Sequence, residues 1–207
     1  MSTVTGNVAA APAAAAGVEA PPRPPATIVP LAGLPFVAAA IGFLVGSIAA
    51  DWTWGLNFCH VAGGGAWTAI DLFVGLVVGP IIGRMPPHAR AEFSVRFMPK
   101  MLLLMPTLVT LTLGSGFQIA RHFQILNTSY PRHAWVVASF VLVGIMAVIA
   151  IGILEPANLA VLFEMRKEHP DVELIGRLMR RFIYTAGITG LMQIGTLIIM
   201  TRIPPGI

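Results

Sequence analysis

The stretch from His60 to Gly83, HVAGGGAWTAIDLFVGLVVGPIIG, decides the class of fold. It is long and apolar enough to cross a bilayer as a helix, which takes about 20 mostly apolar residues. Four of its residues follow the spacing i, i+4, i+7 and i+11, which places them on one helix face. These residues are His60, Gly64, Trp67 and Asp71. At ~1.5 Å per residue, Asp71 lies about 16 Å deeper along the helix than His60.

Asp71 carries a carboxyl group in the predicted interior of the membrane, where an unpaired charge is costly. We therefore expect Asp71 to face neighbouring helices and to have a function, such as relaying a proton or an ion in a small transporter. Thr110 and Gln193 fall near the middle of their own predicted spans, so we expect both to hydrogen-bond to Asp71. Alternatively, Asp71 has a purely structural role, and neighbouring residues satisfy its hydrogen bonds.

The composition excludes an ordinary soluble domain. Of the 207 residues, 56% are hydrophobic and only 11% are charged, whereas about a quarter of the residues in a typical soluble domain are charged. The apolar runs predict an all-α integral membrane bundle of five transmembrane helices in a domain that covers residues 29–207. The predicted spans are about residues 29–50, 56–83, 101–120, 134–163 and 182–203. The Ala- and Pro-rich residues 1–28 are expected to form a disordered cytoplasmic tail.

The basic residues predict the orientation in the lipid bilayer. Ten of the thirteen Lys and Arg fall in the tail, in an expected loop at 84–100 and in an expected loop at 164–181. By the positive-inside rule, the N-terminus is cytoplasmic and the C-terminus lies outside, which fits the inner (cytoplasmic) membrane of a cell. In the second loop we expect a helix that starts at Asp171 and lies on the membrane surface. The sequence contains no basic face or motif for binding nucleic acid.

The conspicuous histidine His60 supports a second functional hypothesis, a haem-b-binding redox protein. A neutral imidazole is a common axial ligand of haem iron, and a facing helix would supply the other ligand. The glycines at 63–65 would leave room for the flat macrocycle beside His60, although close helix packing explains them as well. Arg121 or Arg132 would pair with the haem propionates, since guanidinium groups suit carboxylates.

A third hypothesis is a copper site at the outer face, because imidazole and soft sulfur suit copper. Its candidate ligands are His60, His122 and His133, together with Cys59 or a methionine. Taken singly, His122 and His133 also fit solvated loop residues. Cys59 is the single cysteine, so an intrachain disulfide is excluded. An accessory subunit of a larger membrane complex, or a homo-oligomer, is a further class that the small-residue motifs favour.

The region from about residue 56 to 120 resembles a known group of small integral membrane proteins. The shared pattern is a His near the outer start of a helix, a Gly and a Trp, a loop with Pro and basic residues, and a helix with a Pro and a Gly. Here the pattern consists of His60, Gly64, Trp67, Pro86, Arg90, Lys100, Pro106 and Gly114. It is similar to the group that includes the HemJ-type protoporphyrinogen oxidases, the CopD-like copper proteins and uncharacterised relatives.

This resemblance implies haem b as the cofactor and makes the haem protein the leading hypothesis from the sequence. It implies a role in haem binding for His60 and for the basic residue at the end of the loop, Lys100. Together with the reasoning above, the expected cofactor-binding residues are His60, Gly64, Trp67, Arg121 and Lys100. The predicted topology places Lys100 on the opposite side of the membrane from His60, so the second axial ligand stays open.

Overall fold

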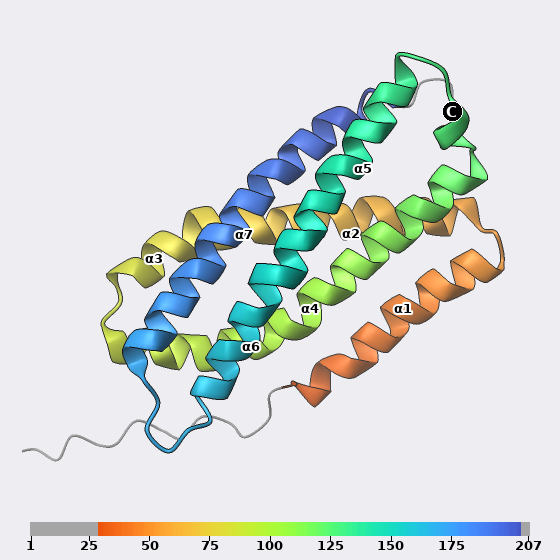
Figure 1. Ribbon diagram of the computed structural model, residues 1–207. Helices are drawn as coiled ribbons and strands as arrows, with labels where there is room; N and C mark the ends of the chain where they lie inside the picture. Colours follow the sequence, from red (N-terminus) through yellow and green to blue (C-terminus); the bar gives the residue numbers. More distant parts are fainter. Residues whose placement is uncertain (1–28, 204–207) are drawn as a thin grey trace, which may run out of the picture.

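A computed structural model describes residues 29–203, and helices account for nearly all of them (Figure 1). Five helical segments are long and apolar enough to cross a membrane, and no β-strand occurs in this described range. The segments are Leu31–Ala49, Thr53–Arg84, Pro87–His122, Arg132–Glu164 and Val172–Met200. The prediction of an all-α chain with five such helices is confirmed, whereas the expected disordered tail at 1–28 lies outside the described residues.

Two of the five segments change their winding partway along. The first consists of α2 (Thr53–Phe73), a π-helical turn η2 (Val74–Val78) and α3 (Gly79–Arg84). The second consists of α5 (Arg132–Ile149), a π-helical turn η4 (Ala150–Leu154) and α6 (Glu155–Glu164). Each π turn is followed within two residues by a proline, Pro80 or Pro156. Because proline has no backbone N–H, it cannot donate to the carbonyl four residues earlier, and the wider turn accommodates this loss.

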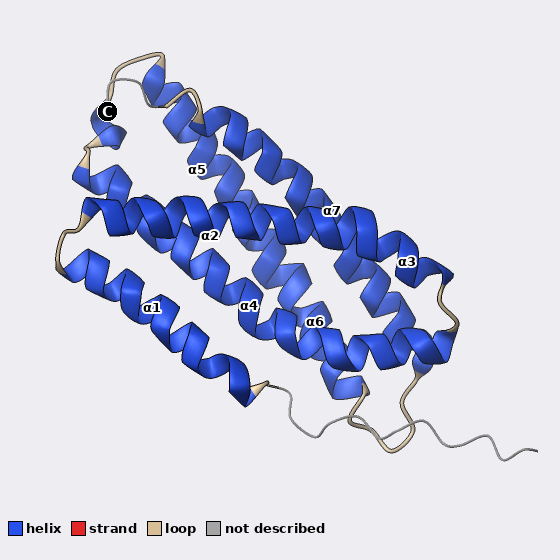
Figure 2. Cartoon of the chain, turned by 180° about the vertical axis from the view of Figure 1, so that it is seen from behind, coloured by secondary structure: helices blue, strands red, loops and turns tan. Residues whose placement is uncertain are grey.

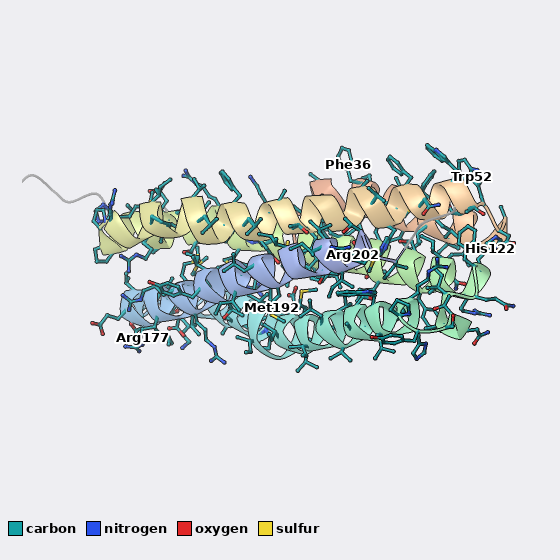
Figure 3. All side chains as sticks on the ribbon, turned by 90° about the horizontal axis from the view of Figure 1, so that it is seen from above. Phe36, Trp52, His122, Arg177, Met192 and Arg202 are labelled. Carbon is teal, nitrogen blue, oxygen red and sulfur yellow. The ribbon has the colours of Figure 1, made fainter. Side chains whose placement is uncertain are left out.

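The helices form a bundle that α2 and α3 cross at an angle. α1 (Leu34–Ala49) lies at one edge beside α4 (Pro87–His122), and α5, α6 and α7 (Val172–Met200) lie on the other side (Figure 1 and Figure 2). The main apolar core joins α2, α4, α6 and α7, and Trp67, Met98 and Met179 are among its buried members. Trp52 and His122 lie at one end of the bundle, and Arg177 lies toward the other (Figure 3).

The start of α4 differs from the sequence prediction. The helix begins at Pro87, so most of the loop expected at 84–100 is helical. Proline suits the first turn of a helix, where its missing N–H has no helical partner. Arg90 closes the short connection from α3, because its side chain donates to the carbonyl oxygens of Ile82 at 3.3 Å and Met85 at 3.2 Å.

The first half of α4 is amphipathic, which explains why its charges resembled those of a loop. Glu92 and Arg96 form an exposed ion pair of 2.7 Å one turn apart. Ser94 and Met98, on the opposite face, are fully buried. The charged residues at 84–100 therefore predicted a loop, although they lie on the polar face of an amphipathic helix.

A buried asparagine ties α6 to α4 beside Pro99, which interrupts the hydrogen bonding of α4. With its side-chain amide oriented to satisfy both neighbours, Asn158 donates from Nδ2 to the Met98 carbonyl oxygen and accepts at Oδ1 from the Leu102 N–H. Both distances are 3.2 Å. Asn158 thus holds α4 at the place where proline weakens it.

α7 confirms one expectation and corrects another. Its N-cap is Asp171, whose carboxylate accepts a hydrogen bond of 2.9 Å from the Leu174 N–H, as the predicted helix start requires. The helix then continues without a break to Met200, so the separate surface helix expected before the last span does not form. Buried residues of its first turns, such as Ile175 and Gly176, pack on neighbouring helices, and Gly176 contacts Arg90 of α4.

Glycines allow α7 to approach the α2–α3 segment backbone to backbone. Gly75 lies directly against Gly187, and a Cβ atom on Gly75 would collide with the Gly187 backbone. Gly190 faces Leu72 in the same way, at 3.0 Å from the position of a Cβ. Contacts between small residues are the usual means of close helix packing in membranes. Short side chains can therefore meet across the two helices.

We expect Gly75→Ala to lower the midpoint of thermal unfolding, because its methyl group would meet the rigid Gly187 backbone. Overpacking of this kind costs about 1–3 kcal/mol. The matched control is Gly144→Ala in α5, since nothing lies within 4 Å of a Cβ built there. Unfolding of the detergent-solubilised proteins measures the difference, and equal midpoints for the two variants would contradict the close crossing.

Candidate functional site

The carboxyl group of Asp71 is the centre of a buried polar cluster between α2 and α7. Asp71 is 1% exposed. Its Oδ2 atom accepts a hydrogen bond of 2.8 Å from Gln193 Nε2 and one of 3.1 Å from Thr189 Oγ1. The expected hydrogen bond between Asp71 and Gln193 is therefore confirmed. Trp67 lies one turn before Asp71 on the same face of α2 and is also buried.

Thr110 does not take part in this cluster, which corrects the prediction from the sequence. Its side chain is exposed on α4 and donates to the Pro106 carbonyl oxygen at 2.7 Å. Position along the span predicted the depth of Thr110 in the bundle but not the direction in which it points. Thr189 makes the hydrogen bond to Asp71 that was expected of Thr110. A sequence signal existed, because Thr189 precedes Gln193 by four residues and so shares its helix face.

The cluster leaves one strong acceptor without a donor. Gln193 is 3% exposed, and its Oε1 atom has no hydrogen-bond partner in the part of the chain that the structure describes. No Lys, Arg or His within residues 29–203 makes an ion pair with Asp71. A buried carboxylate and a buried carbonyl oxygen therefore lie on neighbouring side chains with neither a counter-charge nor a full set of donors. Buried polar groups are normally satisfied, so this arrangement indicates an exchangeable partner.

His60 lies farther along α2, against α4. The ring atom Nδ1 is 2.9 Å from the carbonyl oxygen of Thr112, and the ring packs over Gly116, whose missing Cβ leaves the space. If Nδ1 carries the proton and donates it to this carbonyl, Nε2 keeps a free lone pair. This tautomer is the one that a metal-binding histidine usually adopts.

The surroundings of His60 are less suited to a haem than the imidazole itself. Gly63 and Gly64 pack on α4, where the side chain of Thr112 lies 2.9 Å and 3.3 Å from the positions that their Cβ atoms would take. Gly64 thus serves close helix packing, which is one of the two explanations that the sequence offered for these glycines. Trp67 is 4% exposed and belongs to the core beside Asp71. The nitrogen donor fits haem iron. Gly63 and Gly64 leave no open space for the macrocycle on the side of α4, whereas nothing lies within 4 Å of a Cβ built on Gly65.

Lys100 is remote from His60, as the topology predicted. It lies sixteen residues before Gly116 on α4, which is about 24 Å along the helix. Its side chain is exposed and lines a groove of about 410 Å³ with Arg96, Phe93 and other residues of the first turns of α4. Lys100 and His60 therefore cannot bind one haem together.

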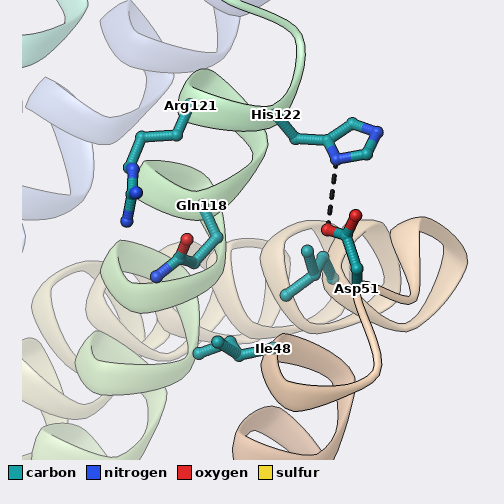
Figure 4. A pocket seen from close by; sticks show the side chains of 6 residues that line it. Ile48, Asp51, Gln118, Arg121 and His122 are labelled. Atoms are coloured by element: carbon teal, nitrogen blue, oxygen red, sulfur yellow. Dashed lines mark hydrogen bonds and ion pairs between the residues drawn. The ribbon is translucent and has the colours of Figure 1, made fainter.

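The end of the bundle where Trp52 and His122 lie carries a separate small cavity. It has a volume of about 210 Å³, and Ile48, Asp51, Leu56, Gln118, Arg121 and His122 line it (Figure 4). His122 Nδ1 lies 3.2 Å from Asp51 Oδ1, whereas the Arg121 side chain points away from this pair. Arg121 and Arg132 are both exposed at this end of the bundle.

The three candidate copper ligands are not brought together. His60 contacts Thr112, His122 pairs with Asp51, and His133 is exposed in the first turn of α5. Cys59 is buried in a small apolar cluster with Leu44. Within residues 29–203, no group of three or more His, Cys, Asp or Glu side chains could hold a metal ion. The predicted outer-face copper site is therefore not assembled.

Comparisons with known proteins add no information on these sites. No model of a protein family matches the chain, and neither a curated protein nor a solved structure is significantly similar to it. The resemblance to the HemJ-type and CopD-like group thus stays a prediction from the sequence.

Proposed function

We propose that this chain is a multi-pass protein of the inner membrane that binds a proton or a small cation at Asp71 and carries it across the bilayer. The observation that supports this most directly is a combination found among residues 29–203: a buried carboxyl group without a basic partner beside the unpaired Oε1 of Gln193. An isolated ionised carboxylate in an apolar environment is strongly disfavoured, so a positive partner must offset its charge.

The proposed orientation has a cytoplasmic N-terminus and an outer C-terminus. The structure supports it through the separation of charge along the bundle. Arg177, from the most basic segment of the chain, lies toward the end opposite to Trp52 (Figure 3). Tryptophan is typical of a membrane–water interface, and Phe43, Trp52, Trp54 and Phe58 form an aromatic cluster at this end.

The neutral donors around Asp71 suit a group that binds and releases its partner. Gln193 and Thr189 stabilise the ionised form by hydrogen bonds but do not neutralise it. A lysine or arginine in the same place would compete with the transported cation. The site therefore holds a carboxylate ready for an exchangeable positive charge rather than a permanent ion pair.

We expect Asp71→Asn to abolish transport, because an amide of nearly the same shape can neither bind a proton nor balance a cation. The measurement is flux into liposomes that contain the full-length protein, with an internal pH dye and imposed gradients of H⁺, Na⁺ or K⁺. Flux by the Asp71→Asn variant should fall to that of protein-free liposomes. The control is Thr110→Val, on an exposed face of α4, which should match the wild type. Absence of any flux through the wild-type protein sinks the proposal.

A haem-b protein with His60 as ligand is the second candidate function. The hydrogen bond between His60 Nδ1 and the Thr112 carbonyl oxygen supports it, since this bond leaves Nε2 available to iron. A bound haem would supply one-electron redox chemistry. His60 would hold the iron, and Thr112 would fix the orientation of the imidazole ring.

Under this second candidate, protein purified from haem-replete cells shows a Soret band that His60→Ala removes. His133→Ala is the matched control, because His133 is exposed in the first turn of α5 and should leave the spectrum unchanged. Colourless protein contradicts the haem hypothesis. Colourless protein that contains copper in metal analysis favours the copper alternative, and stable co-purification of other chains favours an accessory subunit.

A further inference from the structure

We infer that the ligand of the Asp71 site is a proton, held as a neutral carboxylic acid that pairs with the side-chain amide of Gln193. This inference rests on the proposed function and specifies its substrate. It follows from which atoms of the two side chains are already engaged and which are free.

Both side-chain hydrogen bonds from α7 reach the same oxygen of the carboxyl group. Gln193 Nε2 lies 2.8 Å from Asp71 Oδ2, and Thr189 Oγ1 lies 3.1 Å from that same atom. Neither helix partner donates to Oδ1. On the facing amide, Nε2 is engaged and Oε1 is the atom without a partner. Asp71 and Gln193 thus each have one polar atom in the hydrogen bond between them. Each also has one oxygen, Oδ1 or Oε1, for which no donor is found in the described chain.

A proton on Oδ1 of Asp71 would complete the hydrogen bonding between the two side chains. The carboxylic acid then donates from Oδ1 to Gln193 Oε1, while Gln193 Nε2 continues to donate to Oδ2. A carboxylic acid and a primary amide are complementary in this way, because each has one donor and one acceptor side by side. Gln193 Oε1 then has a donor, and the carboxyl group of Asp71 has no charge. The free-energy cost of a buried unsatisfied acceptor and that of a buried charge are therefore both removed.

A metal cation fits the same atoms less well. Hard cations need many oxygen ligands, since Ca²⁺ takes about six to eight and Mg²⁺ takes about six in octahedral geometry. The free oxygen atoms on the two paired side chains are Asp71 Oδ1 and Gln193 Oε1. The cavities of about 210 Å³ and 410 Å³ lie elsewhere, at the outer end and on the first turns of α4. Two oxygens in a tightly packed crossing suit a proton.

The charged and titratable side chains on the packed helices do not replace this proton. His60 lies eleven residues before Asp71 on α2, about 16 Å along the helix. Lys100 on α4 and Arg181 and Tyr184 on α7 are exposed, and Glu155 of α6 is half-buried. None of these residues forms a hydrogen bond or ion pair with Asp71 within the described chain.

The same cluster also accommodates the state after the proton leaves. The ionised carboxylate then keeps the donors of Gln193 and Thr189. Hydrogen bonds to a charged acceptor are stronger than those to a neutral one, so these two offset part of the cost of the buried charge. A site with a satisfied neutral form and a supported ionised form is suited to repeated protonation.

Infrared difference spectroscopy of the full-length protein in lipid tests the inference. We expect the wild type to show the carbonyl stretching band of a protonated carboxylic acid at neutral pH, with a shift in D₂O. Asp71→Asn should remove the band. Gln193→Leu should move it to higher frequency, because the acid loses its acceptor. Glu155→Gln is the control, because Glu155 is a half-buried carboxyl group of α6 that forms no hydrogen bond with Asp71 within the described chain, and it should leave the band in place.

A stability comparison keeps the inference falsifiable if a variant folds poorly. The Asn side chain in Asp71→Asn can donate to Gln193 Oε1 as the acid does, so its thermal midpoint should equal that of the wild type. Asp71→Leu removes both partners of Gln193 and should lower the midpoint. If Asp71→Asn unfolds as early as Asp71→Leu, the neutral pair is wrong.

The outcomes separate this inference from the proposed function. A carboxylic acid band without any ion flux supports the proton site and rejects transport. Cation flux that depends on Asp71, with no such band at any pH, keeps transport and overturns the proton as ligand. A missing band together with missing flux overturns both.

Discussion

The backbone contact between Gly75 and Gly187 is the constraint on which the polar centre depends. It brings α2 and α7 so close that the short side chain of Asp71 reaches Thr189 and Gln193 across the interface. In a bilayer, helices gain little from apolar burial against each other, because lipid is equally apolar. Close packing and hydrogen bonds between helices carry more of the association energy there. The contact between Gly75 and Gly187 provides the close packing, and it also brings Asp71 within hydrogen-bonding distance of Thr189 and Gln193.

The other hydroxyl groups in the spans make clear why the Asp71 cluster is exceptional. Most of them bond within their own helix, and the pattern is a donor four residues after its carbonyl acceptor. Examples are Ser47, Thr68, Thr107 and Thr112. Such local bonds satisfy a polar group without a neighbour. A carboxyl group and a primary amide cannot be satisfied in this way, so Asp71 and Gln193 meet across two helices.

Sequence reasoning located the polar centre but not its full composition. The depth of Asp71 and Gln193 along their spans was enough to predict their contact, because antiparallel helices of known ends align their midpoints. Thr110 has the same depth, yet its side chain faces away, since the rotation of a helix about its axis depends on packing that depth does not describe. His60 was likewise identified as unusual, but only the structure shows that α4 fills the space beside Gly63 and Gly64.

The sequence by itself determined the helices, because twenty apolar residues in lipid can satisfy their backbone only as a helix. It also determined the start of α7 at Asp171, whose capping is a local interaction. The tertiary structure decided a feature that the charge pattern did not predict. Residues 87–100 are helical because one face packs on the core while Glu92 and Arg96 face outward. It also decided that Asp71 meets Thr189 and not Thr110. Contacts between distant helices fix these features, and no local pattern encodes them.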